Sequence, residues 1–84
     1  MSTSNFYVYV HSRLNTGEPF YIGKGRADRC INESNRNKHW KHIVAKDCGF
    51  LTSFLAQELD EEFAVLAEIE AIDAYRRRGI QLVN

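Results

Sequence analysis

Two short runs of alternating aromatic and aliphatic residues near the start of the chain constrain its fold more than any other feature. The first run is FYVYVH at residues 6–11, and the second is FYIG at residues 20–23. Alternation with a period of two predicts strands, and Asn15-Thr16-Gly17 between them predicts the turn of a hairpin. The apolar residues share one face only if odd positions pair with odd positions, because a slip of one residue moves them to the other face. The residues on this apolar face are then Phe6, Val8, Val10, Phe20 and Ile22.

The opposite face of the same hairpin gathers aromatic side chains that carry polar groups. In the odd-with-odd register these are Tyr7, Tyr9, His11 and Tyr21. Lys24, Arg26 and Arg29 follow directly along the chain. Phenol hydroxyls beside fixed positive charge indicate a site that handles phosphate. On this face His11 either tunes Tyr9 or is a half-buried strand residue.

The remaining residues predict a small α+β domain with the order β-β-α-α-β-α. The hairpin strands cover about residues 5–12 and 19–23, and helices are expected over residues 24–32 and up to residue 46. Asn35 or Asn37 caps the second helix, in which Trp40, Ile43 and Val44 have helical spacing. Residues 50–58 are consistent with a third strand or with more helix. Together the 84 residues accommodate one domain, residues 1–84, with one small core.

The last predicted helix carries a carboxylate in an unusual position. This helix begins after Asp60 and ends at three arginines, residues 76–78, followed by Gly79. On a helical wheel, Val65, Ile69 and Ile72 mark the side expected to face the core. Glu68 lies at the edge of that side, where a charge is unfavourable unless it is paired or binds a cation. Glu68 is therefore either the partner of an arginine or a metal ligand, and Glu70 is the second choice for the ligand.

Charge is distributed unevenly along the chain, although the formal net charge is zero. Residues 1–46 hold eight of the 11 Lys and Arg residues and all three histidines, whereas residues 47–75 hold eight of the 11 acidic residues. This asymmetry predicts one basic surface, which suits a phosphodiester backbone, and one acidic surface. The exposed contacts to nucleic acid are expected on the second helix, from Lys38, His39, Lys41 and His42. Lys24 is expected at the start of the first helix, where it either meets a phosphate together with free backbone N–H groups or is merely exposed.

Other features of the sequence exclude several classes of protein. No apolar stretch is long enough to span a membrane, and no secretory leader is visible. Cys30 and Cys48 are too few for a disulfide scaffold, so we expect reduced thiols and a cytoplasmic protein. The two cysteines form no Cys-x-x-Cys pair with which His39 and His42 would complete a zinc site. These histidines are expected to contact substrate phosphate or solvent.

Three segments together resemble the GIY-YIG nuclease family. YVYV followed by FYIGKGRADR resembles the start of that family, AVLAEIEAIDAY resembles its glutamate helix, and GIQLVN resembles its closing asparagine segment. The match spans nearly the whole chain. One departure is visible, because Tyr7 stands where the family has glycine. The resemblance implies a three-stranded antiparallel sheet flanked by helices and an endonuclease that hydrolyses phosphodiester bonds.

The resemblance also implies a role for individual residues. Tyr9 orients or deprotonates the attacking water, with its pKa lowered by the charge of Arg29 and Lys24. Tyr21 hydrogen-bonds the scissile phosphate or the water, and Arg29 stabilises the charge on the pentacoordinate phosphorus. Glu68 holds one Mg²⁺ or Mn²⁺. Asn84 anchors the last segment against the active site.

The resemblance leaves substrate choice and activity open. DNA is the expected nucleic acid, and no separate DNA-binding domain is visible. Specificity then comes from a homodimer, from another partner or from the structure of the DNA. The alternative is a catalytically inactive module on the same fold that binds nucleic acid or protein.

Overall fold

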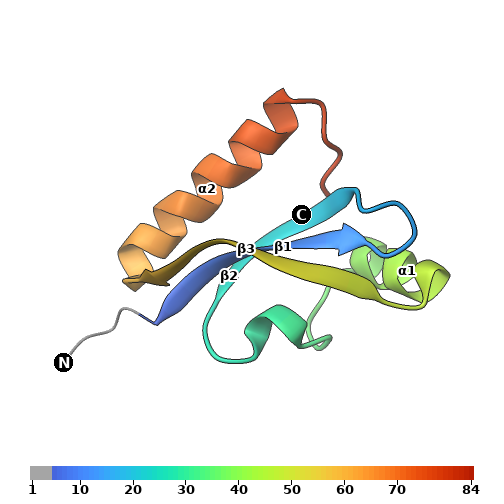
Figure 1. Cartoon of the computed structure of the whole chain (residues 1–84), viewed down its shortest axis with the longest axis horizontal. Coiled ribbons are helices and arrows are strands. Elements are labelled where there is room, and N and C mark those ends of the chain that lie inside the picture. Colours follow the sequence, from blue (N-terminus) through green and yellow to red (C-terminus); the bar gives the residue numbers. More distant parts are fainter. Residues whose placement is uncertain (1–4) are drawn as a thin grey trace.

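The computed structural model describes residues 5–84, which form a three-stranded antiparallel sheet and two α-helices (Figure 1). The elements along the chain are β1 (Phe6–Arg13), β2 (Pro19–Gly25), a 3-10 turn η1 (Arg29–Ile31), α1 (Lys38–Asp47), β3 (Phe50–Leu59) and α2 (Glu61–Arg77). The strand order is β2-β1-β3, so β1 is central and the other two strands are edges. Helix α2 lies along one face of the sheet, and η1 and α1 lie on the opposite face (Figure 1). The chain is thus an α+β protein, as expected.

The hairpin has the register that the hydrophobic pattern predicts. Tyr9 pairs with Gly23, Val10 with Ile22, and His11 with Tyr21. Consequently one face of the hairpin packs against α2 through Val8, Val10 and Ile22, whereas Tyr7, Tyr9 and Tyr21 pack together on the other. We call the second surface the tyrosine face. The aromatic alternation therefore determines which residues can meet at a site.

The helix predicted for residues 24–32 is wrong. Strand β2 continues through Lys24 to Gly25, and only the 3-10 turn η1 follows. Gly23 and Gly25, which flank Lys24, disfavour a helix here, and both allow close contacts. A side chain at Gly23 would collide with the Tyr9 ring, and a Cβ atom at Gly25 would lie 2.6 Å from Cγ of Arg29. Lys24 therefore lies in a strand, not at a helix N-terminus.

The structure decides two alternatives that the sequence left open, the cap of α1 and the conformation of residues 50–58. Asn37 is the N-cap of α1, and its Oδ1 accepts a hydrogen bond of 2.8 Å from the Trp40 backbone N–H. Residues 50–58 belong to β3, which pairs with β1 along its length with two irregularities near Val8. Arg13 at the end of β1 forms a salt bridge of 3.1 Å with the buried Asp47 at the end of α1. This ion pair ties the hairpin to α1.

The side of α2 that faces the sheet shares only Ile72 with the predicted side. Ala64 is fully buried, and Ala67, Ala71, Ile72 and Tyr75 pack against the sheet core. Val65 and Ile69 are instead 37% and 57% exposed. The helical-wheel prediction gave most weight to the largest apolar residues, whereas small alanines make much of the contact between α2 and the sheet.

Candidate functional site

The tyrosine face has a buried layer and a partly exposed layer. Tyr9 is only 1% exposed, while Tyr21 is half-buried, and their ring centroids are 6.3 Å apart. Gly23 lies across from Tyr9 in the neighbouring strand and leaves room for its ring. Both tyrosines therefore depend on the hairpin register, and Tyr21 is the phenol nearer to solvent.

Arg36 is the central residue that the sequence did not single out. It is only 5% exposed, and its Nη1 donates a hydrogen bond of 2.6 Å to the hydroxyl of Tyr9. Nε and Nη2 donate to the carbonyl oxygens of Asn32 and Arg29 at 2.9 and 2.7 Å. Its guanidinium also lies 5.3–5.5 Å from the ring centroids of Tyr9, Tyr21 and Trp40.

This arginine is buried without a counter-charge. Within residues 5–84, no carboxylate lies within 4.0 Å of the Arg36 guanidinium. Buried charges are normally paired, so Arg36 leaves a positive potential beneath the tyrosine face that favours an anion. The sequence did not distinguish Arg36 from the other basic residues, because no local spacing links it to Tyr9.

The expectation that positive charge lowers the pKa of Tyr9 is wrong. Burial raises the pKa of Tyr9 and outweighs the opposing hydrogen bond and charge of Arg36 and the charge of Arg29. Tyr9 is therefore a neutral phenol at pH 7. Since Arg36 donates to the phenol oxygen, the Tyr9 hydroxyl hydrogen is directed to another acceptor.

Tyr7 and His11 hold the backbone around this cluster. The Tyr7 hydroxyl donates to the carbonyl of Ala27 at 2.7 Å and accepts from the N–H of Cys30 at 2.9 Å. Burial is the main cause that raises the pKa of Tyr7 to about 12. His11 is fully buried, with Nε2 bonded to the Cys30 carbonyl and Nδ1 accepting from Trp40 Nε1 at 2.9 Å. Both ring nitrogens are therefore occupied, and His11 makes no hydrogen bond to Tyr9.

Arg29 and Lys24 lie on different sides of β2. Arg29 is half-buried beside Gly25, its Nη1 donates to the Ser34 carbonyl at 3.1 Å, and its charge acts on Tyr9. The Lys24 Nζ atom is 3.8 Å from a carboxylate oxygen of Glu61 in α2. Arg29 therefore belongs to the tyrosine face and Lys24 to the α2 face, so Lys24 is not among the charges that act on Tyr9.

Glu68 is half-buried on the α2 face. Burial raises the pKa of this carboxyl, against the charge and backbone N–H of Lys24. Tyr9, Tyr21, Arg29 and Arg36 lie together on the tyrosine face, and Glu68 lies on the other side of the edge strand β2. The described residues contain no cluster of three or more His, Cys, Asp or Glu side chains that would hold a metal ion. A metal at Glu68 would therefore keep most of its water ligands, as Mg²⁺ does.

Asn84 completes the outer edge of β2. Its Oδ1 accepts a hydrogen bond of 3.0 Å from the Ile22 backbone N–H, and its Nδ2 donates to the Ile22 carbonyl. The Val83 backbone N–H also donates to the Phe20 carbonyl at 2.8 Å. The side-chain amide of Asn84 thus substitutes for a neighbouring strand and fixes the last segment against the strand that carries Tyr21.

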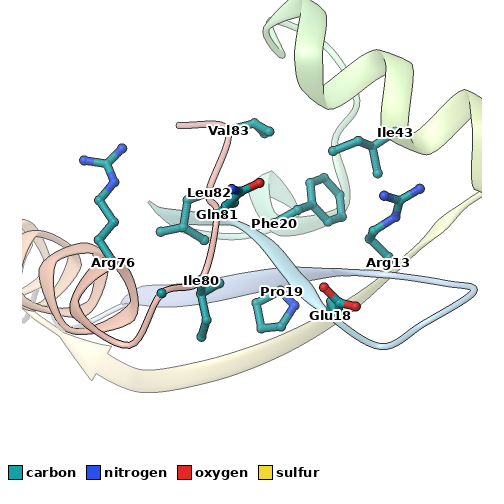
Figure 2. A pocket seen from close by; sticks show the side chains of 11 residues that line it. Arg13, Glu18, Pro19, Phe20, Ile43, Arg76, Ile80, Gln81, Leu82 and Val83 are labelled. Atoms are coloured by element: carbon teal, nitrogen blue, oxygen red, sulfur yellow. The ribbon is translucent and has the colours of Figure 1, made fainter.

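The proposed substrate contacts of α1 are separate from the buried cluster. These side chains, Lys38, His39, Lys41 and His42, are all exposed. A pocket of about 900 Å³ opens elsewhere, between the end of the hairpin, α1 and the segment after α2 (Figure 2). It is lined by residues such as Phe20, Ile43 and Leu82 and by none of the predicted site residues. The tyrosine face, not this pocket, is therefore the candidate site.

Within the described residues, no helix combines the length and apolar character needed to cross a membrane. Comparisons with known proteins found no matching family model, no matching curated protein and no matching solved structure.

Proposed function

We propose that the chain is an endonuclease that hydrolyses phosphodiester bonds, with DNA as the substrate and one Mg²⁺ or Mn²⁺ at Glu68. The observation that carries this proposal is the buried Arg36 guanidinium, which is hydrogen-bonded to Tyr9 and has no carboxylate partner among residues 5–84. A fixed positive charge under phenol hydroxyls suits a phosphate that gains negative charge in the transition state. The sequence resemblance to GIY-YIG nucleases supports the same reaction.

The half-buried residues make the direct contacts to substrate in this proposal. Tyr21 donates a hydrogen bond to the scissile phosphate, and Arg29 pairs with its non-bridging oxygens. Arg36 supplies charge from below without reaching the substrate. Tyr9 stays protonated and orients the attacking water through its hydroxyl, which Arg36 holds in place.

Glu68 fits a metal ion because its carboxylate is half-buried, has no ion pair within 4.0 Å among residues 5–84, and offers the oxygen ligands that Mg²⁺ takes. A Mg²⁺ held there would lie across the edge strand β2 from Tyr21 and Arg29, so it would supply positive charge to the leaving 3′ oxygen of a nucleic-acid strand that crosses this edge. Arg29 and Arg36 stabilise charge independently of that ion. Asn84 holds the closing segment against β2 at Ile22.

A binding module without activity is the second candidate. It is favoured by the 1% exposure of Tyr9, which restricts access of water to its hydroxyl. In that case the basic surface of α1 would bind nucleic acid, and no metal-dependent cleavage would occur.

The test is cleavage of plasmid DNA, branched DNA and RNA with and without Mg²⁺, using wild type, Glu68→Gln and the matched control Glu70→Gln. We expect Glu68→Gln to abolish metal-dependent cleavage and Glu70→Gln, an exposed neighbour, to cleave as wild type. Because burial raises the pKa of Glu68, its ionised form is unfavourable in the folded state above that pKa. Thermal melts of Glu68→Gln at pH 7 should therefore equal or exceed wild type.

Two outcomes would contradict the proposal. Cleavage by Glu68→Gln at the wild-type rate would show that Glu68 is not the metal ligand and would move the assignment to Glu70. Binding without cleavage on all three substrates would favour the binding module.

A further inference from the structure

The outward side of α2 carries an apolar centre between two ends of opposite charge. Val65, Leu66 and Ile69 are 37%, 57% and 57% exposed in the middle of the helix. The first turn contains Glu61 and Glu62, and the last turn contains Arg76 and Arg77. The opposite side of the helix, with Ala64 and Ala71, packs on the sheet. The outward stripe is thus not needed for the fold described above.

Glu62 and Arg76 stand symmetrically about Ile69. Each lies seven positions from Ile69, and seven residues are nearly two helical turns, so all three project from the same side. Glu61 already contacts Lys24, and Arg77 forms a 2.9 Å ion pair with Asp73. By contrast, neither Glu62 nor Arg76 has an ion pair within 4.0 Å among residues 5–84. The exposed Arg76 lies at the rim of the pocket described above, and its Nη2 donates a long hydrogen bond, 3.5 Å, to the Asn84 carbonyl.

This arrangement is complementary to itself. When two copies of α2 pack antiparallel with Ile69 on the two-fold axis, Glu62 of each copy lies opposite Arg76 of the other. The exposed apolar residues meet in the centre, as in the two-fold interfaces that use the same patch on both subunits. An anionic membrane would be repelled by the acidic end of the helix. The charges therefore select a second copy of this chain.

We propose that the protein forms a homodimer through the outward stripe of α2, defined here as Glu62, Val65, Leu66, Ile69 and Arg76. This dimer leaves the tyrosine face free, because that face lies on the other side of the sheet. The two-fold axis that relates two antiparallel helices is perpendicular to both helix axes. The β2 edges of the two copies therefore lie on the same side of the dimer. The proposal rests on α2 alone and holds whether or not the chain is a nuclease.

The expected affinity is modest. A helix of 17 residues is about 26 Å long at 1.5 Å per residue. A single pair of such helices buries less than the roughly 800 Å² per partner of a standard stable interface. Self-association should therefore depend on concentration.

Sedimentation equilibrium of the full chain tests the proposal by charge exchange. Glu62→Arg places two arginines opposite each other at both ends of the dimer, and Arg76→Glu does the same with two glutamates. Each variant alone should dimerise at least tenfold more weakly than wild type. An equimolar mixture of the two variants should form a heterodimer, and the double variant Glu62→Arg/Arg76→Glu should regain self-association. Asp28→Arg, an exposed charge reversal directly before η1, is the control and should dimerise as wild type.

The result that overturns the proposal is a wild-type chain that stays monomeric up to roughly 1 mM, where even weak specific contacts are populated. Self-association that does not respond to either charge reversal would also overturn it and would place the interface elsewhere, such as the exposed edge of β3. Circular dichroism of each variant tests whether it is folded, and both Glu62 and Arg76 are exposed.

Discussion

Arg36 and Tyr9 form a pair whose strength follows from burial. A hydrogen bond from a charged donor contributes roughly 1.5–3 kcal/mol, more than one between neutral groups. The bond from Arg36 Nη1 to the Tyr9 hydroxyl is 2.6 Å long and buried. Tyr9 is therefore held in one orientation, which a phenol needs if it is to position a water molecule.

The coupling between these two residues is measurable in a double-mutant cycle of Tyr9→Phe and Arg36→Met. We expect urea unfolding of the four proteins to give a coupling free energy of about 1–3 kcal/mol. The control cycle combines Tyr9→Phe with Arg13→Met, because Arg13 contacts Asp47 instead. That coupling should stay within roughly 0.5 kcal/mol. Equal coupling in both cycles would show that Arg36 does not act on Tyr9 directly.

The hydroxyls of Tyr7 and Tyr21 should separate structural from catalytic roles. Tyr7→Phe leaves the buried Cys30 N–H without its acceptor, so it should lower the free energy of unfolding by roughly 1–3 kcal/mol and leave the cleavage rate of folded protein nearly unchanged. Tyr21→Phe should slow cleavage by roughly a hundredfold or more with little loss of stability. Tyr9→Phe should slow cleavage to a similar extent. Equal loss of rate in all three variants would mean that the phenols only pack the face.

At the scale of elements, His11 fastens three segments. It lies in β1, its Nε2 bonds to the Cys30 carbonyl in η1, and its Nδ1 accepts from Trp40 in α1. Burial is the main cause that lowers the pKa of His11 to about 4, and the charges of Arg36 and Arg29 lower it further. The short η1 turn and α1 are thus attached to the sheet by a neutral imidazole.

This attachment should make stability depend on pH. The unfolded chain has an ordinary histidine pKa near 6.5 and binds a proton that the folded chain excludes down to pH 4. The contribution of neutral His11 to the free energy of unfolding is therefore complete above pH 6.5. It is lost as the pH falls to 4, a decrease of about 3 kcal/mol. Urea unfolding at pH 7 and pH 4.5, followed by circular dichroism, should show this loss in wild type. It should persist in His39→Gln, an exposed control, and largely vanish in His11→Gln. A wild-type curve that is flat over this range would contradict the buried neutral histidine.

Elements with a strong local signal could be predicted from the sequence. The hairpin register follows from strict alternation, and the residue type that accepts a helix N–H limited the cap of α1 to Asn35 or Asn37, of which the structure has Asn37. The predicted helix at residues 24–32 was wrong because Gly23 and Gly25 serve contacts with Tyr9 and Arg29, which only the tertiary structure reveals. The side of α2 that faces the sheet was mistaken, except at Ile72, because alanines form much of its contact stripe.

The candidate site was predictable to the same extent. Tyr9 and Tyr21 meet because alternation places them on one face. Arg36 was missed because its partners Tyr9, Arg29 and Asn32 lie at unrelated spacings, and no periodic pattern connects a loop residue to a strand.

At the scale of the whole molecule, the basic residues of α1 and the acidic first turn of α2 lie on opposite sides of the sheet. Exposed Lys38 and Lys41 lie on α1, whereas the acidic first turn of α2 packs on the opposite side of the sheet. A duplex bound across η1 and α1 would avoid that acidic surface. Lys and Arg contacts to phosphate release counterions, which makes affinity fall with salt.

Binding to DNA, measured without metal so that no cleavage occurs, should therefore weaken steeply between low and physiological salt. Lys38→Ala or Lys41→Ala should reduce affinity and the salt slope by about one counterion each, with little change in rate at saturation. Arg29→Ala should reduce the rate more than the affinity. Arg78→Ala, beyond the last turn of α2, is the control and should bind as wild type. A log affinity that stays flat with salt would instead indicate a protein-binding module.

Trp40 gives the molecule an optical reporter at its candidate site. It is the only tryptophan in the chain, it is 1% exposed, and the guanidinium of Arg36 lies 5.3 Å from its ring. The emission wavelength of an indole depends on the local electric field. A phosphate that compensates the charge of Arg36 would therefore shift the emission maximum of Trp40. Occupancy of the tyrosine face can therefore be followed in unlabelled protein, separately from any bond that is cut.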